Sequence, residues 1–371
     1  MKILIAGDFC PMDRVSKLIE NEDYESVFGE VTGYTQQADY SIVNLEAPVV
    51  ETSSKPIEKC GPNLKCTSKA IKALKYAGFK MITLANNHFY DYGDDGVKQT
   101  LNACKKEGID IVGGGMNLFE AANIFYKEFR GSKFAIINCC EHEFSIATET
   151  SGGSNPINPI QQYYAIQEAA KNADKVIVIT HGGHEMFQLP SPRMKETYRF
   201  FVDAGADAVI NHHQHCYSGY EVYKGVPIFY GLGNFCFDWT GKQNSIWNEG
   251  YMVILQIDDD MKFELIPYIQ GDKNSGIRIL EDKNSFDSRI LGLNTIIAND
   301  KLLKSEHQKW MNQTSKRYKL ALEPYQNRYL AALYIKGLLP SFITKKKKLR
   351  LLNYLECEAH LERIINTLRN K

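Results

Sequence analysis

The sequence has no excess of charge of either sign, because 44 lysine and arginine residues balance 44 aspartate and glutamate residues. Proteins that bind nucleic acid or an anionic membrane through their overall field carry a net positive charge. We therefore predict no nucleic-acid partner. Charged residues make up 24% and hydrophobic residues 44% of the 371 residues, as is typical of a soluble globular protein.

The chain also lacks the cysteine pairs of a redox or zinc motif. It contains nine cysteines, an odd number, and no two of them have CxxC spacing. This pattern indicates free thiols in a reducing compartment rather than a disulfide framework. The first apolar run is too short for a signal-peptide core, and no later stretch approaches the ~20 continuous apolar residues of a membrane span. We therefore expect a cytoplasmic protein.

Short apolar runs recur along the first part of the chain, each ending in polar or glycine-rich residues, and amphipathic helical patterns lie between several of them. Alternating strands and helices predict an α/β fold with largely parallel pairing. The predicted strands are 3–6, 40–44, 81–85, 109–112, 134–137, 175–180, 208–210, 227–230 and, as the final one, 251–257. The predicted helices include 67–77, 96–107, 159–172 and 194–204.

From about Ser285 onward the sequence has the spacing of helices, with a break at Pro340. We expect one domain over residues 1–270 and a mainly helical region over 271–371. The basic run Lys345–Lys348 stands beside apolar Leu349. It is interpreted either as the solvated start of the last helix or as a weak peripheral contact with a membrane surface.

Residues with metal-ligand or acid–base chemistry follow several of the predicted strands. In open α/β sheets, functional sites gather at the carboxyl ends of the strands. A single polar residue there means little, but five such strand ends predict one shared site. The residues are Asp8, Glu46, Asn87 with His88, His181, and His213 with His215.

The histidine cluster after strand 208–210 is the strongest local signal. Residues two apart in an extended segment point to the same side, so His213 and His215 would face one site and His212 would point elsewhere. Neutral imidazole is a ligand for zinc, iron, nickel and manganese. The alternative interpretation is a polar loop that is rich in histidine.

Two further strand ends carry the sequences Asn86-Asn87-His88 and His181-Gly182-Gly183-His184-Glu185. The Asn87 oxygen is a credible metal ligand, and the adjacent His88 could donate a proton to a leaving group. A structural turn explains that motif equally well. His184 and Glu185 would line the rim of the pocket or pack.

Two acids complete the set. Asp8 follows the first strand and Glu46 the second. A carboxylate that bridges two cations would hold them ~3.5–4 Å apart, which is the geometry of two-metal hydrolysis. Each acid alone would be an ordinary strand-end residue, so their weight comes from the combination.

The order of these motifs resembles the bacterial capsule-synthesis family typified by poly-γ-glutamate biosynthesis (CapA-type) proteins, a branch of the calcineurin-like metallophosphoesterases. The resemblance covers about residues 1–270. The motifs that carry it are Gly7-Asp8, Asn44-Leu45-Glu46, Ala85–His88, His181–Glu185 and His212–His215, with Asp91-Tyr92-Gly93, Gly205-Ala206-Asp207 and Gly231–Phe235 beside them.

The resemblance implies a four-layer αββα sandwich with a centre of one or two divalent metal ions, such as manganese, iron or zinc. It implies Asp8, Glu46, Asn87, His181, His213 and His215 as ligands and His88 as the general acid or a stabiliser of the transition state. Arg14 and Asn234, with His184 and Glu185, would contact the substrate. The usual Asp-x-His of the first motif reads Asp8-Phe9-Cys10, so Cys10 would supply a thiolate ligand or simply pack.

Two functions follow from the resemblance. The first is a metal-dependent phosphoester hydrolase that acts on a phosphorylated small molecule or surface-polymer precursor in capsule or cell-surface polymer synthesis. The second is a non-hydrolytic component of a polymer-synthesising ligase complex, which would bind other polymer-synthesis proteins. A metal-stabilised binding module is a third expectation.

Overall fold

The structure is a computed structural model that describes residues 1–51, 53–257, 261–325 and 327–369. It contains two compact units, Met1–Lys304 and Ser305–Lys371. The boundary expected at residue 270 lies inside the first unit, because the chain that follows it still packs into that unit's core. Phe286 and Ile290 belong to the same buried cluster as Ile3 and Ile5.

The first sheet contains most of the early strands of the chain. They are β1 (Lys2–Phe9), β2 (Tyr40–Leu45), β3 (Met81–Thr83), β4 (Asp110–Val112), β13 (Asn234–Cys236), β14 (Glu249–Ile257), β15 (Met261–Gln270) and β16 (Ile277–Ile279). The strand order is β16-β15-β14-β1-β2-β3-β4, and β13 pairs with the end of β1. From β1 to β4 the pairing is parallel, so the carboxyl ends of these strands lie at one edge.

The second sheet has the strand order β11-β12-β10-β9-β7-β6. Its strands are β6 (Phe125–Phe129), β7 (Ser132–Cys140), β9 (Lys175–His181), β10 (Ala208–His212), β11 (Tyr220–Tyr223) and β12 (Val226–Phe229). Parallel pairing joins β7, β9, β10 and β12. A small antiparallel pair, β5 (Gly114–Gly115) and β8 (Gly153–Ser154), lies apart from both sheets.

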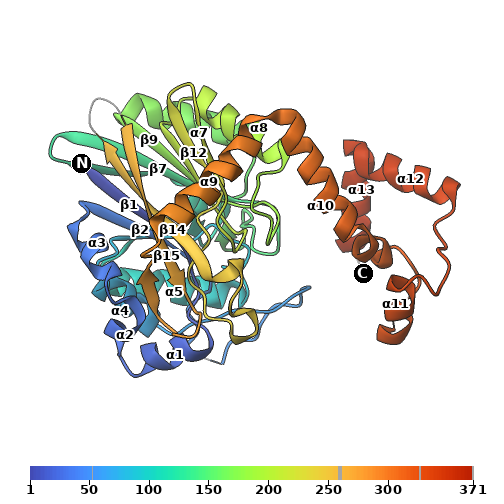
Figure 1. Ribbon diagram of the computed structural model, residues 1–371, viewed down its shortest axis with the longest axis horizontal. Helices are drawn as coiled ribbons and strands as arrows, with labels where there is room; N and C mark the ends of the chain where they lie inside the picture. The colour runs from blue at the N-terminus through green and yellow to red at the C-terminus, as the bar shows by residue number, and fades with distance from the viewer. Residues whose placement is uncertain (52, 258–260, 326, 370–371) are drawn as a thin grey trace. The chain divides into compact units, whose positions relative to one another are not determined.

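Helices cover the outer faces of the two sheets (Figure 1), with α3 and α5 contacting the first sheet and α7 and α8 the second. The helices of this unit are α1 (Asp13–Glu20), α2 (Tyr24–Phe28), α3 (Val31–Gln37), α4 (Lys69–Tyr76), α5 (Gly93–Glu107), α6 (Leu118–Ala121), α7 (Pro159–Asn172), α8 (Pro192–Asp203) and α9 (Lys283–Ala298). Two short 3₁₀ turns lie at Thr240–Lys242 and Ile246–Asn248.

Alternation along β1 shows how the layers stack. Leu4 and Ala6 point into the cluster beneath the helices, whereas Ile3 and Ile5 point into the cluster that the two sheets share. Both faces of the strand are therefore buried, which explains why it is apolar throughout rather than alternating. The four-layer αββα sandwich is confirmed.

The predicted strands and helices are present, with one correction. Segment 251–257 lies within β14 but is not the final strand, because β15 and β16 follow it as antiparallel edge strands. Residues of β15 alternate between partly and more fully exposed over its first half. That half-solvated pattern differs from the continuous apolar runs of the inner strands, so the positions of apolar runs did not predict β15.

The second unit is helical. It contains most of α10 (Asp300–Ala321), then α11 (Arg328–Ile335), α12 (Lys345–Glu356) and α13 (Glu358–Arg369). The predicted break at Pro340 lies between α11 and α12 and is confirmed. Within the described residues, the helices are all too short or too polar to cross a membrane.

Gly7 in β1 has no room for a side chain, so an added methyl group should destabilise the protein. A Cβ at this position would lie 1.9 Å from the backbone oxygen of Gly233, which cannot move as a side chain can. Gly7→Ala should therefore lower the free energy of unfolding by about 2–3 kcal/mol. Gly292→Ala, in helix α9 with nothing within 4 Å, should instead raise it by about 0.5–1 kcal/mol. Denaturant unfolding of both variants tests this; equal effects would contradict the packing at Gly7.

Candidate metal centre

The predicted site residues come together at the carboxyl ends of the parallel strands of both sheets. Asp8 lies near the end of β1 and pairs in register with Asn44 of β2 and Asn234 of β13. His181 ends β9 and is in register with His212, which ends β10. The other predicted ligands and the predicted general acid lie in the segments that follow β2, β3 and β10; they are Glu46, Asn87, His88, His213 and His215, and all are buried.

Two groups of side chains have the spacing needed to hold a cation. The ligand atoms of Glu46, His181 and His213 all lie within 4.8 Å of one another, and those of Asp8, Glu46 and His215 do so too. The Asn87 side-chain oxygen is 3.0 Å from His181 Nε2 and so joins the first group. Because Glu46 belongs to both groups, its carboxylate stands where a bridging ligand would.

The environment of Glu46 fits a bound cation. Its carboxylate is fully buried, and within the described part of the chain neither oxygen has a hydrogen-bond partner. Burial, and after it the Asp8 carboxylate, raises the pKa of Glu46 well above its ordinary value. A buried acid without partners is costly unless a positive charge compensates it. A divalent cation at this carboxylate would supply that charge.

The imidazoles at the centre favour the form that binds metals. Burial, and next the neighbouring His213, lowers the pKa of His181 well below its ordinary value. Burial likewise lowers the pKa of His215. Neutral imidazole has a free lone pair, whereas imidazolium has none to offer a cation. The same crowding that disfavours protonation therefore prepares these side chains as ligands.

The backbone conformation that brings His213 and His215 to the centre differs from the predicted extended segment. His213 and His215 have positive φ angles of 90° and 55°, so the chain after β10 is not extended and strand alternation does not apply. Both still reach the centre, with ring centroids 5.9 Å apart. The prediction that His212 points elsewhere is wrong. Its Nδ1 lies 3.4 Å from the Asp8 carboxylate, because His212 is the last residue of β10 and faces β1 across the sheets.

His88 is held by a buried acid that the sequence analysis treated only as a flanking residue. The Nδ1 atom of His88 lies 2.7 Å from Asp91 Oδ2, which also accepts the backbone N–H of Leu64 at 2.7 Å. The other oxygen of Asp91 is bonded to the Lys59 ammonium, which lies 3.2 Å from His88 Nδ1. Lys59 comes from an irregular segment without periodicity, so no sequence signal could have identified it.

Lys59 and Asp91 form a buried ion pair whose loss should destabilise the protein. Their side chains are 1% and 0% exposed. Lys59→Met leaves Asp91 charged and without its cation, which typically costs about 3 kcal/mol or more. Lys55→Met, at an exposed position of the same segment, is the matched control and should change stability little. Denaturant unfolding compares the two; a small, equal effect would show that the pair contributes nothing.

The two residues predicted to contact substrate from outside the centre both have internal partners. Asn234 is fully buried, and its side-chain oxygen is 2.9 Å from His215 Nδ1, so it orients that imidazole. The Arg14 guanidinium donates to both oxygens of Asp238, at 2.9 and 2.6 Å, and to the Asp272 carbonyl at 2.8 Å. Their contact with substrate stays a prediction.

Cys10 lies outside both groups of ligand atoms and packs in the core beneath the helices. Burial, and next the Glu46 carboxylate, raises the pKa of its thiol well above the ordinary value. Because Cys10 belongs to neither group of ligand atoms, the geometry favours the packing alternative. At the outer part of the site, Glu185 is exposed and His184, half-buried, stacks edge-on against Phe187. Their predicted role at the rim stays a prediction.

A small pocket opens onto this centre. It has a volume of about 190 Å³ and is lined by Asn87, Glu141, His142, Glu143, His181, Gly183 and His213. Glu141 is fixed there by the backbone N–H of Gly183, at 2.9 Å, and by Arg193. Drug-sized ligands occupy pockets of about 300–1,000 Å³, so this one suits a small polar group such as a phosphoryl group.

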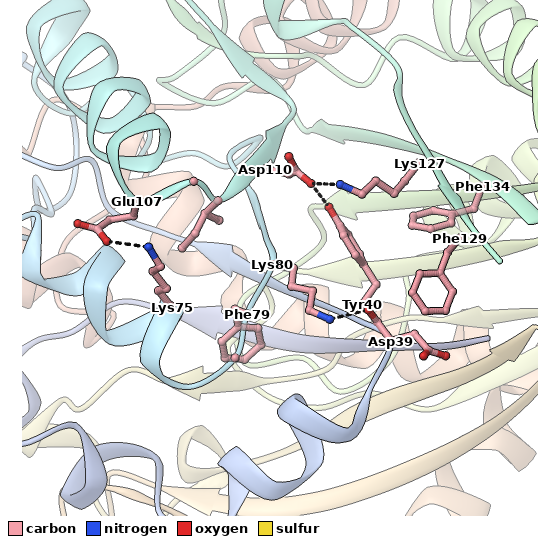
Figure 2. A pocket seen from close by; sticks show the side chains of 13 residues that line it. Asp39, Tyr40, Lys75, Phe79, Lys80, Glu107, Asp110, Lys127, Phe129 and Phe134 are labelled. Carbon is pink, nitrogen blue, oxygen red and sulfur yellow. Dashed lines mark hydrogen bonds and ion pairs between the residues drawn. The ribbon is translucent and has the colours of Figure 1, made fainter.

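A larger cavity, of about 500 Å³, lies at the opposite ends of the strands (Figure 2), where β2 and β4 begin. Its charged side chains are already paired with one another. Asp110 accepts from Tyr40 at 2.6 Å and from Lys127 at 3.1 Å, and Lys75 donates to Glu107 at 3.3 Å. Several charged groups of this cavity are thus already paired, whereas the smaller pocket is lined by candidate metal ligands.

The chain is similar to proteins of bacterial capsule synthesis. Residues 2–239 match the family described as "Bacterial capsule synthesis protein PGA_cap". A "Capsule biosynthesis protein CapA" of Bacillus anthracis is 36% identical over 255 residues, which are 66% of this chain and 62% of that protein. A "PGA biosynthesis protein CapA" of Bacillus subtilis is 34% identical over 64% of each chain. The chain thus spans less than two thirds of the length of these relatives.

More distant similarities were also found. A Mycobacterium tuberculosis protein named "Probable polyglutamine synthesis accessory protein" is 28% identical over 49% of this chain and 52% of its own. Among solved structures, a novel phosphatase of Mycoplasma pneumoniae aligns with 74% of this chain and 95% of its own, at a TM-score of 0.47 and 18% identity. The NAD nucleotidase of Haemophilus influenzae covers 86% of this chain and 70% of its own, with a TM-score of 0.44 and 11% identity.

Proposed function

Because the chain belongs to the bacterial capsule synthesis protein family PGA_cap, we propose that it is a metal-dependent phosphoester hydrolase acting in capsule or cell-surface polymer synthesis. The observation that carries the proposal is the fully buried Glu46 carboxylate, which has no hydrogen-bond partner among the described residues and is shared by two groups of ligand atoms. A cation shared by the two groups would compensate the charge of this acid, which supports the proposal.

The proposed ligands form two sets that share Glu46. Asn87, His181 and His213 would hold one ion, and Asp8 with His215 would hold the other. A bound divalent cation supplies Lewis-acid chemistry by withdrawing charge from phosphoryl oxygens. Two such ions outweigh the charges of Asp8 and Glu46, and a centre with excess positive charge attracts a phosphate ester.

The residues around the ligands orient them. Asn44 donates to the Asp8 carboxylate at 2.7 Å, and the backbone N–H of His213 donates to its other oxygen at 3.1 Å. The Asn234 oxygen fixes the His215 ring at 2.9 Å. Such outer partners set the direction of ligand lone pairs and so the geometry of the centre.

His88 would act as the general acid. Its Nδ1 atom is engaged by Asp91, which leaves Nε2 as the ring nitrogen available to a substrate. A proton given to the departing oxygen prevents the build-up of an alkoxide, which is the usual role of a histidine beside a phosphoryl group. Asp91, itself held by Lys59 and the Leu64 backbone, keeps the ring in one orientation.

Hydrolysis of a generic aryl phosphate by the untagged protein tests the proposal. We expect turnover that a chelator abolishes and that manganese, iron or zinc restores. If the protein retains stoichiometric metal but hydrolyses no member of a broad phosphoester panel, the hydrolase proposal is wrong.

That negative result would favour the second candidate function, a non-hydrolytic component of a polymer-synthesising complex. The naming of a relative as an accessory protein of polymer synthesis supports this alternative. In that case the metal centre would hold the strand ends and loops in place, and chelation should lower stability without affecting any hydrolytic reaction.

A further inference from the structure

The second unit, residues 305–371, has almost no core of its own. Of its described residues, only Glu323 is fully buried, at 2% exposure. Large apolar side chains instead remain open to solvent, including Tyr329 at 72%, Leu338 at 67% and Leu349 at 59%. A helical unit of this size cannot gain much stability from apolar burial in this state. Its exposed apolar side chains are therefore available to bind a partner outside the unit.

Polar contacts, together with the Tyr325 ring packed against Tyr334 and Phe342, hold the turn of this unit together. The Glu323 carboxylate accepts from the Ser341 hydroxyl, from the Phe342 backbone N–H at 2.9 Å and from the Tyr334 hydroxyl at 3.2 Å. The Tyr325 hydroxyl donates to the Pro340 carbonyl at 2.6 Å. These contacts fix the segment between α11 and α12 while the neighbouring Leu338 and Phe342 stay exposed.

The zero net charge of the whole chain conceals two oppositely charged parts. Residues 305–371 carry 14 lysines and arginines against 5 acids, a net charge of +9. Residues 1–304 carry 30 against 39, a net charge of −9. The unit with the exposed apolar side chains is therefore strongly cationic, and its charge favours an anionic partner.

Helix α12 carries lysines and exposed apolar side chains on one face. Lys345, Lys348 and Leu352 are spaced at i, i+3 and i+7, so they lie along the same side of the helix. Leu349 and Leu355 flank this stripe and are exposed as well. The four lysines 345–348 also occupy the first turn, where the helix dipole disfavours positive charge unless an anion is present.

We propose that residues 305–371 dock onto the surface of an anionic phospholipid bilayer. The lysines of α12 meet the headgroups, and the exposed side chains of α11, residues 338–342 and α12 enter the boundary with the acyl chains. Leucine and aromatic side chains beside lysines are the signature of helices that lie in a membrane interface. The exposed apolar side chains are spread over α11, residues 338–342 and α12, and a fluid bilayer can accept such scattered side chains. A second copy of the unit carries the same +9 charge and would be repelled.

Co-sedimentation of the full chain with lipid vesicles tests this inference independently of the metal centre. We expect at least about 100-fold tighter binding to phosphatidylcholine vesicles with about 30% phosphatidylglycerol than to phosphatidylcholine alone. Raising the salt from about 0.1 to 0.5 M should weaken binding strongly, because the Debye length shortens.

Two variants separate the electrostatic and the apolar contributions to vesicle binding. Replacing Lys345–Lys348 with glutamine should weaken vesicle binding about 10-fold or more. Leu349→Ser with Leu352→Ser changes only exposed positions, so the unit should keep its helicity and still lose binding. The matched control replaces four exposed lysines of the first unit, Lys72, Lys98, Lys105 and Lys171, with glutamine and should bind like the wild type.

Three outcomes overturn the inference. The first is a wild-type protein that stays in the supernatant with anionic vesicles. The second is equal weakening by the control lysine variant, which would indicate nonspecific charge attraction. The third is a dimer that forms with rising protein concentration and does not bind lipid. Such a dimer would show that the apolar face of residues 305–371 binds a second copy of the chain.

Discussion

Glu46→Gln is expected to empty both cation sites at once and to reduce phosphoester hydrolysis by about 10³-fold or more. The carboxylate of Glu46 belongs to both groups of ligand atoms, whereas every other predicted ligand belongs to one. A neutral amide cannot bridge two cations as a carboxylate does. Elemental analysis of the purified variant measures the metal directly, and an aryl phosphate assay measures the turnover.

The same substitution should have the opposite effect on the metal-free protein. Without a cation, wild-type Glu46 is either a buried charge without partners or an acid forced into its neutral form beside Asp8. Glutamine avoids both, so the chelated variant should be more stable than the chelated wild type by about 1–3 kcal/mol. With metal present the order reverses, because only the wild type gains stability from binding.

Glu58→Gln is the matched control, since it makes the same change at an exposed carboxylate. It should leave metal content, turnover and stability unchanged. If Glu46→Gln retains the metal of the wild type, the assignment of Glu46 as the shared ligand is wrong. If chelation leaves the stability of the wild type unaffected, a cation does not compensate this acid.

His88→Ala is expected to lower kcat by about 10²–10⁴-fold while metal content stays at the wild-type level. The reason is that His88 belongs to neither group of ligand atoms and instead bonds to Asp91 at 2.7 Å. Parallel elemental analysis and steady-state kinetics separate this role from that of a ligand. His360→Ala, in the second unit, removes a histidine far along the chain from the centre and should change neither quantity.

A comparison of substrates with different leaving groups tests the role of His88 more directly. An oxygen that departs readily as an anion needs little protonation, whereas an alkoxide needs much. The loss on His88→Ala should therefore be smaller for a nitrophenyl phosphate than for an alkyl phosphate. An equal loss with both substrates, or a loss of metal, would contradict the assignment of His88 as the general acid.

Much of the fold, and the gathering of the candidate ligands at one edge, could be predicted from the sequence, because both depend on local patterns; the complete ligand set was implied only by the family resemblance. The apolar runs that become β1, β2, β9 and β10 are buried on both faces, so they are continuous and easily recognised. Parallel strands bring their carboxyl ends to one edge, so Asp8 and Glu46, which follow neighbouring strands of one sheet, could be expected near each other. His181 joins them from the second sheet.

The remaining parts depend on contacts that no local pattern encodes. Lys59 reaches Asp91 from an irregular segment, and only the tertiary structure brings them together. His212 faces Asp8 because β10 and β1 belong to different sheets that meet at this edge. The positive φ angles of His213 and His215 broke the alternation on which their prediction was based, although both reached the expected site.

Anomalous X-ray diffraction from crystals of the untagged protein, measured on both sides of a transition-metal absorption edge, tests the central claim most directly. We predict a peak bounded by Glu46, Asn87, His181 and His213, and, if a second ion binds, another between Glu46, Asp8 and His215. Density showing only water beside Glu46, in protein never exposed to a chelator, would contradict the metal centre and with it the proposed hydrolysis.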